Sequence, residues 1–350
     1  MSVVLVTGGC GFIGSHFIRL VLQRTDWRVV NLDKLTYAGN LENLEGVAEG
    51  PAYRFVRGDI GDRDRVDSLL REERPWGVVN FAAESHVDRS ILDSSPFFQT
   101  NVYGVQVMLE AGRQSGVERF VQVSTDEVYG DADGKDPFHE DSPLCPSSPY
   151  AASKAAADLL CLSYRRTYGL PILIARSSNN YGPRQFPEKL IPFIIRSALN
   201  GQDIPVYGDG LQRRDWLYVQ DNCQAILDVL ECGRLGAIYN VATGVEWTNL
   251  EAIQSVCRLL ARQVGLDLDT LLQRVKLGKD RPGHDRRYAL STQRIHRELG
   301  WAPQVSFENG LKHTVRWYLE SGDWAERVVC GEYRDYYEAV YLRAWGQSSK

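Results

Sequence analysis

The stretch T-G-G-C-G-F-I-G, residues 7–14, decides the fold of this chain. It follows a short apolar run and opens a segment with helical spacing, and its glycines Gly8, Gly11 and Gly14 recur at every third position. Glycine permits a tight turn and lets the backbone approach a pyrophosphate, which then lies at the positive N-terminus of the helix. A glycine-rich turn in isolation is equally typical of an ordinary loop. In this context the motif predicts a strand, a turn and a helix that bind a dinucleotide.

The second apolar run supports that interpretation because it ends in an acid. Asp33 lies nineteen residues beyond Gly14. A carboxylate at the end of the second strand can accept hydrogen bonds from an adenosine ribose and would repel a 2′-phosphate. The neighbouring Lys34 weakens this preference without reversing it. We therefore predict NAD, rather than NADP, as the cofactor.

Apolar runs alternate with helical segments through the first half of the chain. Most runs are apolar on both faces, as expected of a parallel sheet covered by helices. The alternation predicts an α/β fold with a Rossmann-like, doubly wound parallel sheet. The expected strands are Val3–Thr7, Arg28–Asp33, Tyr53–Gly58, Gly77–Ala83, Arg119–Thr125 and Leu170–Arg176, and the expected helices include Phe12–Gln23, Arg63–Glu73, Phe97–Ser115 and Tyr150–Tyr168.

The pattern becomes less regular after residue 185, with more aromatic residues and turns. We predict an NAD-binding domain over residues 1–185 and a smaller mixed α/β lobe, mainly for the nucleotide sugar, over residues 186–350, and we allow for the chain to cross back to the sheet. The stretch Trp324–Trp345 is rich in tyrosine and tryptophan and is predicted to be a packed helix.

Composition excludes several classes of protein. The net charge of −5 argues against a nucleic-acid or membrane-surface binder. The seven cysteines are scattered without a C-x-x-C motif, which favours a reducing, cytoplasmic location without a disulfide framework. The six histidines show no ligand-like pairing, so we expect no metal site. The N-terminal apolar run reaches glycine after five residues, and we expect neither a leader nor a membrane span.

A second motif, P-Y-A-A-S-K at residues 149–154, places Tyr150 and Lys154 on one face of a helix start. A free tyrosine, with a pKa of about 10, is a poor base at neutral pH. A nearby ammonium and the positive nicotinamide of NAD would lower that pKa, so Tyr150 could take a proton from a hydroxyl while hydride leaves the same carbon. The alternative is a surface pair one helical turn apart, which is common in proteins.

Together, G-x-x-G-x-x-G and Y-x-x-x-K resemble the motifs of the extended short-chain dehydrogenases/reductases that act on nucleotide sugars. In V-S-T-D-E-V-Y-G, residues 123–130, Thr125 matches the serine or threonine usual in that superfamily. The two acids that follow, Asp126 and Glu127, resemble the signature of the dTDP-glucose 4,6-dehydratases. Without that context, Asp126 would be interpreted as a turn residue and Glu127 as a solvated or ion-paired side chain.

The resemblance explains why two acids are needed. Dehydration of a sugar across C5 and C6 requires a base for the C5 proton and an acid for the departing hydroxyl. Oxidation at C4 makes the C5 proton acidic, and hydride return to C6 regenerates NAD. The resemblance implies that Glu127 is the base and Asp126 the acid. Two close carboxylates also discourage joint ionisation, so one can remain protonated near neutral pH.

The resemblance extends over nearly the whole chain and implies a full set of site residues. The catalytic residues would be Thr125, Asp126, Glu127, Tyr150 and Lys154. The NAD site would comprise Gly8, Gly11, Phe12, Ile13, Gly14, Asp33, Lys34, Leu35, Thr36, Asp59, Ile60, Phe81, Ala82, Ala83, Ser85, Thr100, Tyr150, Lys154 and Asn180. The substrate site would comprise Ser85, His86, Thr125, Asn179, Glu188, Lys189, Leu190, Pro205, Tyr207, Arg214, Asn249, Arg281 and His284. From the residues alone, the two arginines are more typical of surface charge and His284 of a loop.

The expected activity is NAD-dependent dehydration of dTDP-glucose to its 4-keto-6-deoxy product. The alternatives are another nucleotide-sugar 4,6-dehydratase, a 4-epimerase or a UDP-glucuronate decarboxylase; the last two need no acid at C6. A non-catalytic, NAD-binding regulatory protein is the alternative from another class. The resemblance also implies a homodimer formed by the helices Phe97–Ser115 and Tyr150–Tyr168, with Val102, Val105, Leu109, Leu159, Leu160 and Leu162 as apolar candidates. Burial of these residues within one subunit is the alternative.

Overall fold

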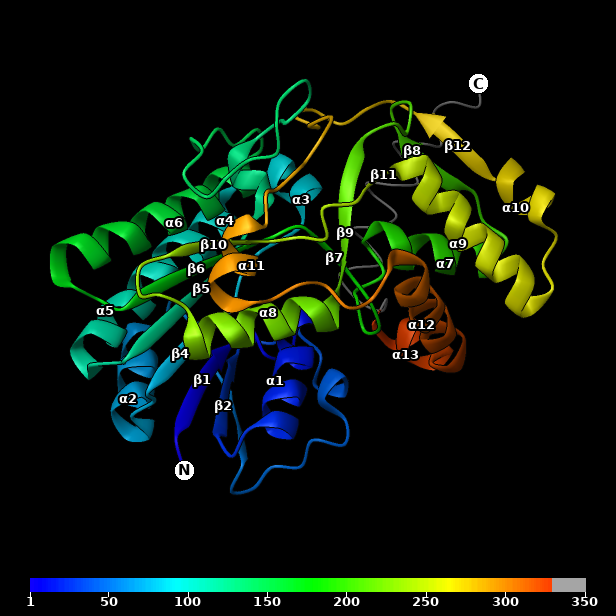
Figure 1. Cartoon of the computed structure of the whole chain (residues 1–350). Helices are drawn as coiled ribbons and strands as arrows, with labels where there is room; N and C mark the ends of the chain where they lie inside the picture. Colours follow the sequence, from blue (N-terminus) through cyan, green and yellow to red (C-terminus); the bar gives the residue numbers. More distant parts are fainter. Residues whose placement is uncertain (329–350) are drawn as a thin grey trace.

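The fold is built on one large parallel sheet (Figure 1). The computed structural model describes residues 1–328. The seven strands lie in the order β10-β6-β5-β4-β1-β2-β3, and every neighbouring pair is parallel. Their bounds are β1 Val3–Thr7, β2 Arg28–Asp33, β3 Tyr53–Arg57, β4 Gly77–Asn80, β5 Arg119–Thr125, β6 Ile172–Ser177 and β10 Ile238–Val241. This order confirms the predicted Rossmann-like, doubly wound sheet.

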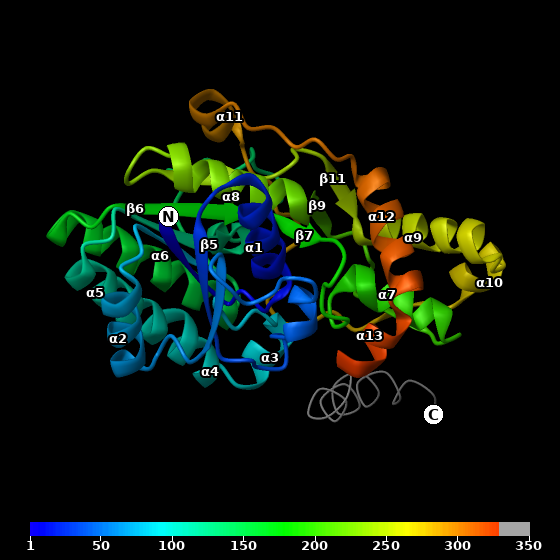
Figure 2. The same ribbon diagram turned by 90° about the horizontal axis from the view of Figure 1, so that it is seen from below.

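Helices cover both faces of the sheet, as the apolar runs require (Figures 1 and 2). On one face lie α1 (Phe12–Arg24), α8 (Val219–Cys232) and α11 (Gln293–Leu299). On the other lie α2 (Arg63–Glu73), α5 (Val105–Ser115) and α6 (Pro149–Tyr168). The shorter elements beside them are η1 (Leu41–Leu44), α3 (Val87–Leu92), α4 (Ser95–Phe98), η2 (Gln99–Gly104) and η3 (Asp126–Tyr129).

A second group of elements packs around its own apolar core beside the sheet (Figure 1). It contains a three-stranded sheet in the order β11-β9-β7 and the parallel pair β12-β8. The strands are β7 Asn179–Tyr181, β8 Ile204–Tyr207, β9 Arg213–Tyr218, β11 Glu246–Thr248 and β12 Val275–Gly278. The helices are α7 Leu190–Leu199, α9 Asn249–Val264, α10 Leu268–Gln273, α12 Phe307–Glu320 and α13 Gly322–Val328.

The structure corrects several expected boundaries. The strand expected over Gly77–Ala83 ends at Asn80, because the chain then turns away from the sheet toward α3. The helix expected over Phe97–Ser115 begins at Ser95 and contains a π-helical turn, η2, a rare form that is frequent at functional sites. The helix expected over Trp324–Trp345 is described only as far as Val328, in α13, and its remainder lies outside the described residues.

The seventh strand, β10, was not among the strand ranges expected from the sequence, although a return of the chain to the sheet was allowed for. After β6 the chain forms β7, α7, β8 and β9, then returns through α8 to place β10 against β6. The residues of β10 are few and carry no alternating pattern, so only their place beside β6 marks them as part of the large sheet. Among residues 1–328, no helix is long and apolar enough to cross a bilayer.

A buried ion pair and a hydrogen bond join β6, α6 and η3. Arg176 of β6 donates from Nε to Asp158 Oδ2 of α6 at 2.8 Å and from Nη1 to the Tyr129 hydroxyl of η3 at 2.7 Å. Its guanidinium also lies over the Tyr129 ring, 4.7 Å from the centroid. Because all three side chains are buried, removing one partner leaves a charge without solvent or a counter-ion.

We therefore expect Asp158→Ala to lower the free energy of unfolding by about 3–5 kcal/mol, measured by chemical denaturation. Glu110→Ala is the matched control, because it removes an exposed ion pair to Arg113 within α5 and should leave stability nearly unchanged. Equal, small effects for both variants would contradict the role of the buried pair.

Candidate active site

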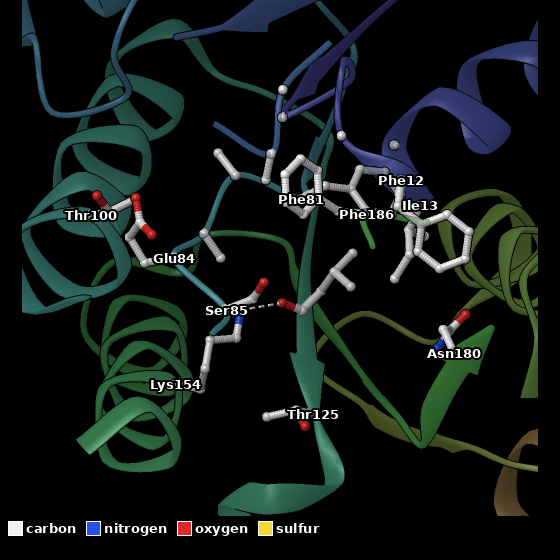
Figure 3. Close-up of a pocket in the computed structure, with 18 of the residues that line it drawn as sticks. Phe12, Ile13, Phe81, Glu84, Ser85, Thr100, Thr125, Lys154, Asn180 and Phe186 are labelled. Atoms are coloured by element: carbon white, nitrogen blue, oxygen red, sulfur yellow. Dashed lines mark hydrogen bonds between the residues drawn. The ribbon is translucent and has the colours of Figure 1, made fainter. Parts of the chain in front are cut away.

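One cleft opens at the carboxyl ends of β1, β2, β4 and β5, at the point where the strand order reverses (Figure 3). This is where open α/β sheets bind ligands. The cleft collects most of the residues predicted for the cofactor: Gly8, Gly11, Phe12, Ile13, Gly14, Asp33, Lys34, Thr36, Ile60, Phe81, Ala82, Ala83, Ser85, Thr100, Tyr150, Lys154 and Asn180. It also contains Thr125, Asp126, Glu127, Asn179, Glu188 and Lys189.

The glycine turn has no room for side chains. Gly8 has φ +69°, and a Cβ there would lie 2.7 Å from the Ala82 nitrogen. A Cβ on Gly14 would lie 2.4 Å from the Gly8 carbonyl oxygen. Gly11 is the N-cap residue of α1 and carries no side chain, so the N-terminus of this helix lies open to the cleft. The turn thus forms a cradle suited to a pyrophosphate.

Asp33 lies at the end of β2, where two backbone amides hold its carboxylate. Leu35 N donates to Oδ1 and Cys10 N to Oδ2, both at 2.8 Å. Leu35 has φ +59° and lies outside the cleft lining. Each carboxylate oxygen retains lone pairs for a ribose hydroxyl.

Lys34 forms an ion pair with Asp59, which follows the neighbouring strand β3. Its Nζ lies 2.6 Å from Asp59 Oδ2, and Asp59 is outside the cleft lining. A cation held in this ion pair is less suited to a 2′-phosphate than a free lysine would be. The pairing therefore favours NAD over NADP, in the same direction as Asp33.

The two neighbouring acids follow β5 in the short helix η3. Thr125 caps this helix: its hydroxyl accepts from Glu127 N at 3.3 Å and donates to Asp126 Oδ1 at 3.2 Å. The Asp126 residue is only 3% exposed, and its Oδ2 has no hydrogen-bond partner. Such burial is not expected of an ordinary turn aspartate, so the carboxyl is placed for a ligand in the cleft.

The surroundings of Asp126 and Glu127 affect the pKa values of the two acids differently. Loss of solvent and the adjacent Glu127 charge raise the pKa of Asp126 to about 8. Burial also raises the pKa of Glu127, but the nearby charges of Arg281, Arg214 and Lys189 oppose that shift. At neutral pH Asp126 is therefore the better proton donor and Glu127 the better base.

Tyr150 and Lys154 enter the cleft from the first turns of α6. Ser148 caps the helix through a hydrogen bond to Ala151 N at 3.1 Å, and Pro149 occupies a first-turn position that suits its fixed φ. Both Tyr150 and Lys154 are buried, so they do not form a surface pair.

The Lys154 ammonium is held by a backbone carbonyl oxygen. Lys154 Nζ donates to the Val123 carbonyl oxygen at 2.7 Å (Figure 3), and burial lowers the pKa of Lys154 to about 8. Burial raises the pKa of Tyr150 above its usual value, and the Glu127 charge adds to that shift. The residues of this chain thus do not by themselves lower the tyrosine pKa. The positive charge of a bound nicotinamide would still lower the pKa of Tyr150, as predicted.

Several predicted substrate residues lie beyond the cleft lining. The outlying residues are His86, Leu190, Pro205, Tyr207, Arg214, Asn249, Arg281 and His284. Tyr207 donates its hydroxyl to Asp88 Oδ2 at 3.0 Å, and Arg281 Nη1 lies 3.3 Å from Asp88 Oδ1. Arg214 donates to the Asp285 carbonyl at 2.8 Å. The charges of Arg214 and Arg281 both oppose the rise in the pKa of Glu127. These two arginines therefore lie on the side of the cleft that contains the acids.

The remaining predicted residues hold the framework of that side. His86 lies 3.4 Å from Glu188 and is buried, and His284 Nδ1 lies 2.6 Å from Asp280 Oδ1. Leu190 begins α7, Asn249 begins α9 and Pro205 lies in β8.

Some lining residues were not assigned from the sequence. They are Leu32, Ala38, Gly39, Gly58, Val123, Ser124, Ser177, Ser178, Gln185 and Phe186. Ser177, Ser178, Gln185 and Phe186 flank Asn179, Asn180 and Glu188 in the chain, so their position at a strand end was the available signal. Asp88, which organises Tyr207 and Arg281, gave no signal because its partners are distant in the sequence. Within the described part of the chain, no group of acids, histidines and cysteines could hold a metal ion.

A doubly wound sheet with a glycine cradle, a ribose-side acid and a buried tyrosine–lysine pair defines an extended short-chain dehydrogenase/reductase. The chain belongs to the family described as GDP-mannose 4,6 dehydratase, whose model matches residues 5–314.

Named relatives narrow the class. The chain is 48% identical over 353 residues to the dTDP-glucose 4,6-dehydratase of Neisseria meningitidis, covering 95% of this chain and 98% of the relative. The crystal structure of DesIV, a dTDP-glucose 4,6-dehydratase from Streptomyces venezuelae with NAD and TYD bound, matches with 48% identity and a TM-score of 0.87, covering 93% of this chain and 99% of DesIV. A Thermus thermophilus UDP-glucose 4-epimerase in complex with NAD matches at 34% identity and a TM-score of 0.81, covering 91% and 99% of the two chains.

The glycine cradle makes a direct prediction. Gly14→Ala should lower NAD affinity by at least about tenfold, because the new Cβ displaces the turn from the helix start. Isothermal titration of protein freed of cofactor measures this. Gly50→Ala is the control, since a Cβ there meets no atom within 4 Å. Unchanged affinity in Gly14→Ala would contradict the cradle.

Proposed function

We propose that this chain catalyses the NAD-dependent dehydration of dTDP-glucose to dTDP-4-keto-6-deoxyglucose and water. The observation that carries the proposal is the meeting of Asp126 and Glu127 with Tyr150 and Lys154 in one cleft. Oxidation and reduction at a sugar carbon need only the tyrosine–lysine pair and NAD. A buried, protonated acid beside a second carboxylate serves elimination of water. Relatives that cover nearly the whole chain carry the name of this activity.

The residues of the cleft fit NAD. The glycine turn would hold the pyrophosphate, Asp33 the adenosine ribose, and Tyr150 and Lys154 the nicotinamide half. Thr100 and Asn180 also line the cleft, in the NAD site that the resemblance implies. The bound cofactor supplies hydride acceptance at C4 of the sugar and hydride return at C6, with a positive ring charge in the oxidised state.

In the oxidation step, Tyr150 receives the proton of the C4 hydroxyl as hydride leaves C4. Thr125 contributes a hydroxyl at the same edge of the cleft, and its interaction with the Tyr150 side chain opposes part of the rise in the tyrosine pKa that burial causes. Lys154, fixed on the Val123 carbonyl, holds a positive charge on the face of α6 that it shares with Tyr150.

In the elimination step, Glu127 removes the C5 proton, which the C4 ketone has made acidic. Asp126 donates its proton to the C6 hydroxyl, so that water departs and a C5–C6 double bond forms. Hydride return to C6 and proton return from Glu127 to C5 complete the 4-keto-6-deoxy sugar. The roles of the two acids follow from their different protonation at neutral pH.

The first experiment is to incubate purified protein, without added NAD, with dTDP-glucose and UDP-glucose in separate reactions. The products are identified by mass spectrometry. We expect loss of one water, preferentially from dTDP-glucose. A thymine methyl contributes only about 1–3 kcal/mol in an apolar pocket, so the preference is partial. An unchanged mass with inverted C4 would show an epimerase. Absence of any conversion, even after NAD is added, would favour another nucleotide sugar first and the regulatory alternative second.

The acid assignment makes a pH prediction. Asp126 donates a proton only below its pKa, so turnover should fall as the pH rises through about 8. Asp126→Asn should lower turnover by roughly 10²–10⁴-fold and remove this limb of the profile. Because oxidation precedes elimination, the variant should accumulate reduced nicotinamide, seen by near-ultraviolet absorbance. Tyr150→Phe, the matched control, should accumulate none; reduced cofactor in neither variant would refute the assignment.

We also propose a homodimer formed through α5 and α6. Leu159 of α6 is 57% exposed, and Val102, Leu160 and Leu162 are partly buried. Val105 and Leu109 are fully buried against α2 within the subunit, so these two predicted contacts are wrong. Sedimentation velocity separates the dimer from the monomer.

The six cysteines that the structure describes as free thiols support a reducing, cytoplasmic location.

A further inference from the structure

The cofactor cleft has two walls that come from distant parts of the chain. One wall includes Thr36, Ala38 and Gly39, from the loop after β2. The other includes Phe186 and Glu188, from the segment before α7. Figure 3 shows Phe186 beside Phe12 and Ile13, where the glycine turn begins its helix. A contact that joins these walls would restrict the exit of a bound dinucleotide.

Tyr37 makes that contact. Its neighbours in the chain line the cleft, whereas its own side chain reaches across to the second wall. The ring meets the Phe186 ring edge-on, with centroids 5.4 Å apart and an interplanar angle of 86°. The hydroxyl donates to Glu188 Oε1 at 3.4 Å. The side chain remains partly exposed, so the contact lies toward the outside of the cleft.

A third element, α3, also contacts Tyr37 through Arg89. The Arg89 guanidinium lies over the Tyr37 ring, 4.3 Å from its centroid. A cation over an aromatic face is attractive, and Arg89 and Glu188 have opposite charges on either side of the phenol. The ring is thus held by an aromatic edge, a carboxylate and a cation.

The far side of the contact is firmly anchored. The Glu188 side chain is 1% exposed and lies 3.4 Å from His86 Nε2. The next residue, Lys189, donates from Nζ to the Ser85 carbonyl at 2.8 Å and lies 3.6 Å from Glu188. His86 and Ser85 directly precede α3, so the second wall is tied to the chain that leaves β4.

We propose that Tyr37 retains the dinucleotide in the cleft between turnovers, by joining the loop after β2 to Phe186 and Glu188 across the outer side of the cofactor. NAD then leaves only when these contacts separate. Retention suits a reaction that returns its hydride and ends with the cofactor oxidised, because no exchange of cofactor is needed. The inference rests on NAD binding and not on the identity of the sugar nucleotide.

The test is the rate at which purified holoenzyme exchanges bound NAD for an excess of isotopically labelled NAD, read by mass spectrometry. Tyr37→Ala should exchange NAD at least about tenfold faster, because it loses the ring contacts with Phe186 and Arg89. Tyr37→Phe keeps the ring and loses the interactions of the hydroxyl with Glu188 and Arg89, so its exchange rate should lie between those of Tyr37→Ala and the parent.

Tyr168→Ala is the matched control. Tyr168 also lies beneath an arginine, Arg113, at 5.2 Å, and beside an aromatic ring, Tyr164, at 5.1 Å, but it does not line the cleft. Its exchange rate should equal that of the parent.

Two results would overturn the proposal. The first is exchange at the parental rate in both Tyr37 variants, with melting temperatures confirming that they fold. The second is a loss of turnover in Tyr37→Ala that saturating NAD does not restore, which would place Tyr37 in the chemistry instead. Since exchange is measured without sugar nucleotide, its outcome is independent of whether dTDP-glucose is the substrate.

Discussion

The site depends on one close backbone contact, between the turn after β1 and the chain that leaves β4. The Gly8 position approaches Ala82 so closely that a Cβ would lie 2.7 Å from the Ala82 nitrogen. The contact is extended by hydrogen bonds from Phe81 N to the Thr7 carbonyl and from the Thr7 hydroxyl to Asn80 Oδ1. Because β1 and β4 are neighbours at the switch in strand order, this contact forms the floor of the cleft.

Loss of solvent then determines the chemistry on that floor. Asp126, Tyr150 and Lys154 are all buried, and for each of them burial is the largest influence on the pKa. Burial favours the neutral form of every group, so Asp126 retains a proton and Lys154 loses part of its preference for one. Arg214, from the second lobe, opposes this effect at both acids, whereas Arg281 opposes it at Glu127. The packing of one lobe against the other thus contributes to the difference between the two acids, together with the charge of Glu127 beside Asp126.

The second lobe also encloses the cofactor side. The segment from Asn179 to Lys189 leaves the large sheet after β6 and supplies residues to the same cleft. Its Glu188 is tied to the chain before α3 and to the loop after β2. One short segment therefore contacts both the adenosine side and the substrate side.

The sequence alone determined the fold class and the cofactor, and it predicted the cofactor cradle and the catalytic groups. These depend on local order: glycines at every third position, an acid at a strand end, and a tyrosine and lysine one helical turn apart. Tertiary structure alone decided the place of β10, the buried pair of Arg176 and Asp158, and the contacts of Asp88 and Tyr37. It also decided the protonation of Asp126 and the hydrogen bond from Lys154 to the Val123 carbonyl. Burial and pairing between distant residues depend on which surfaces meet, and no local pattern records that.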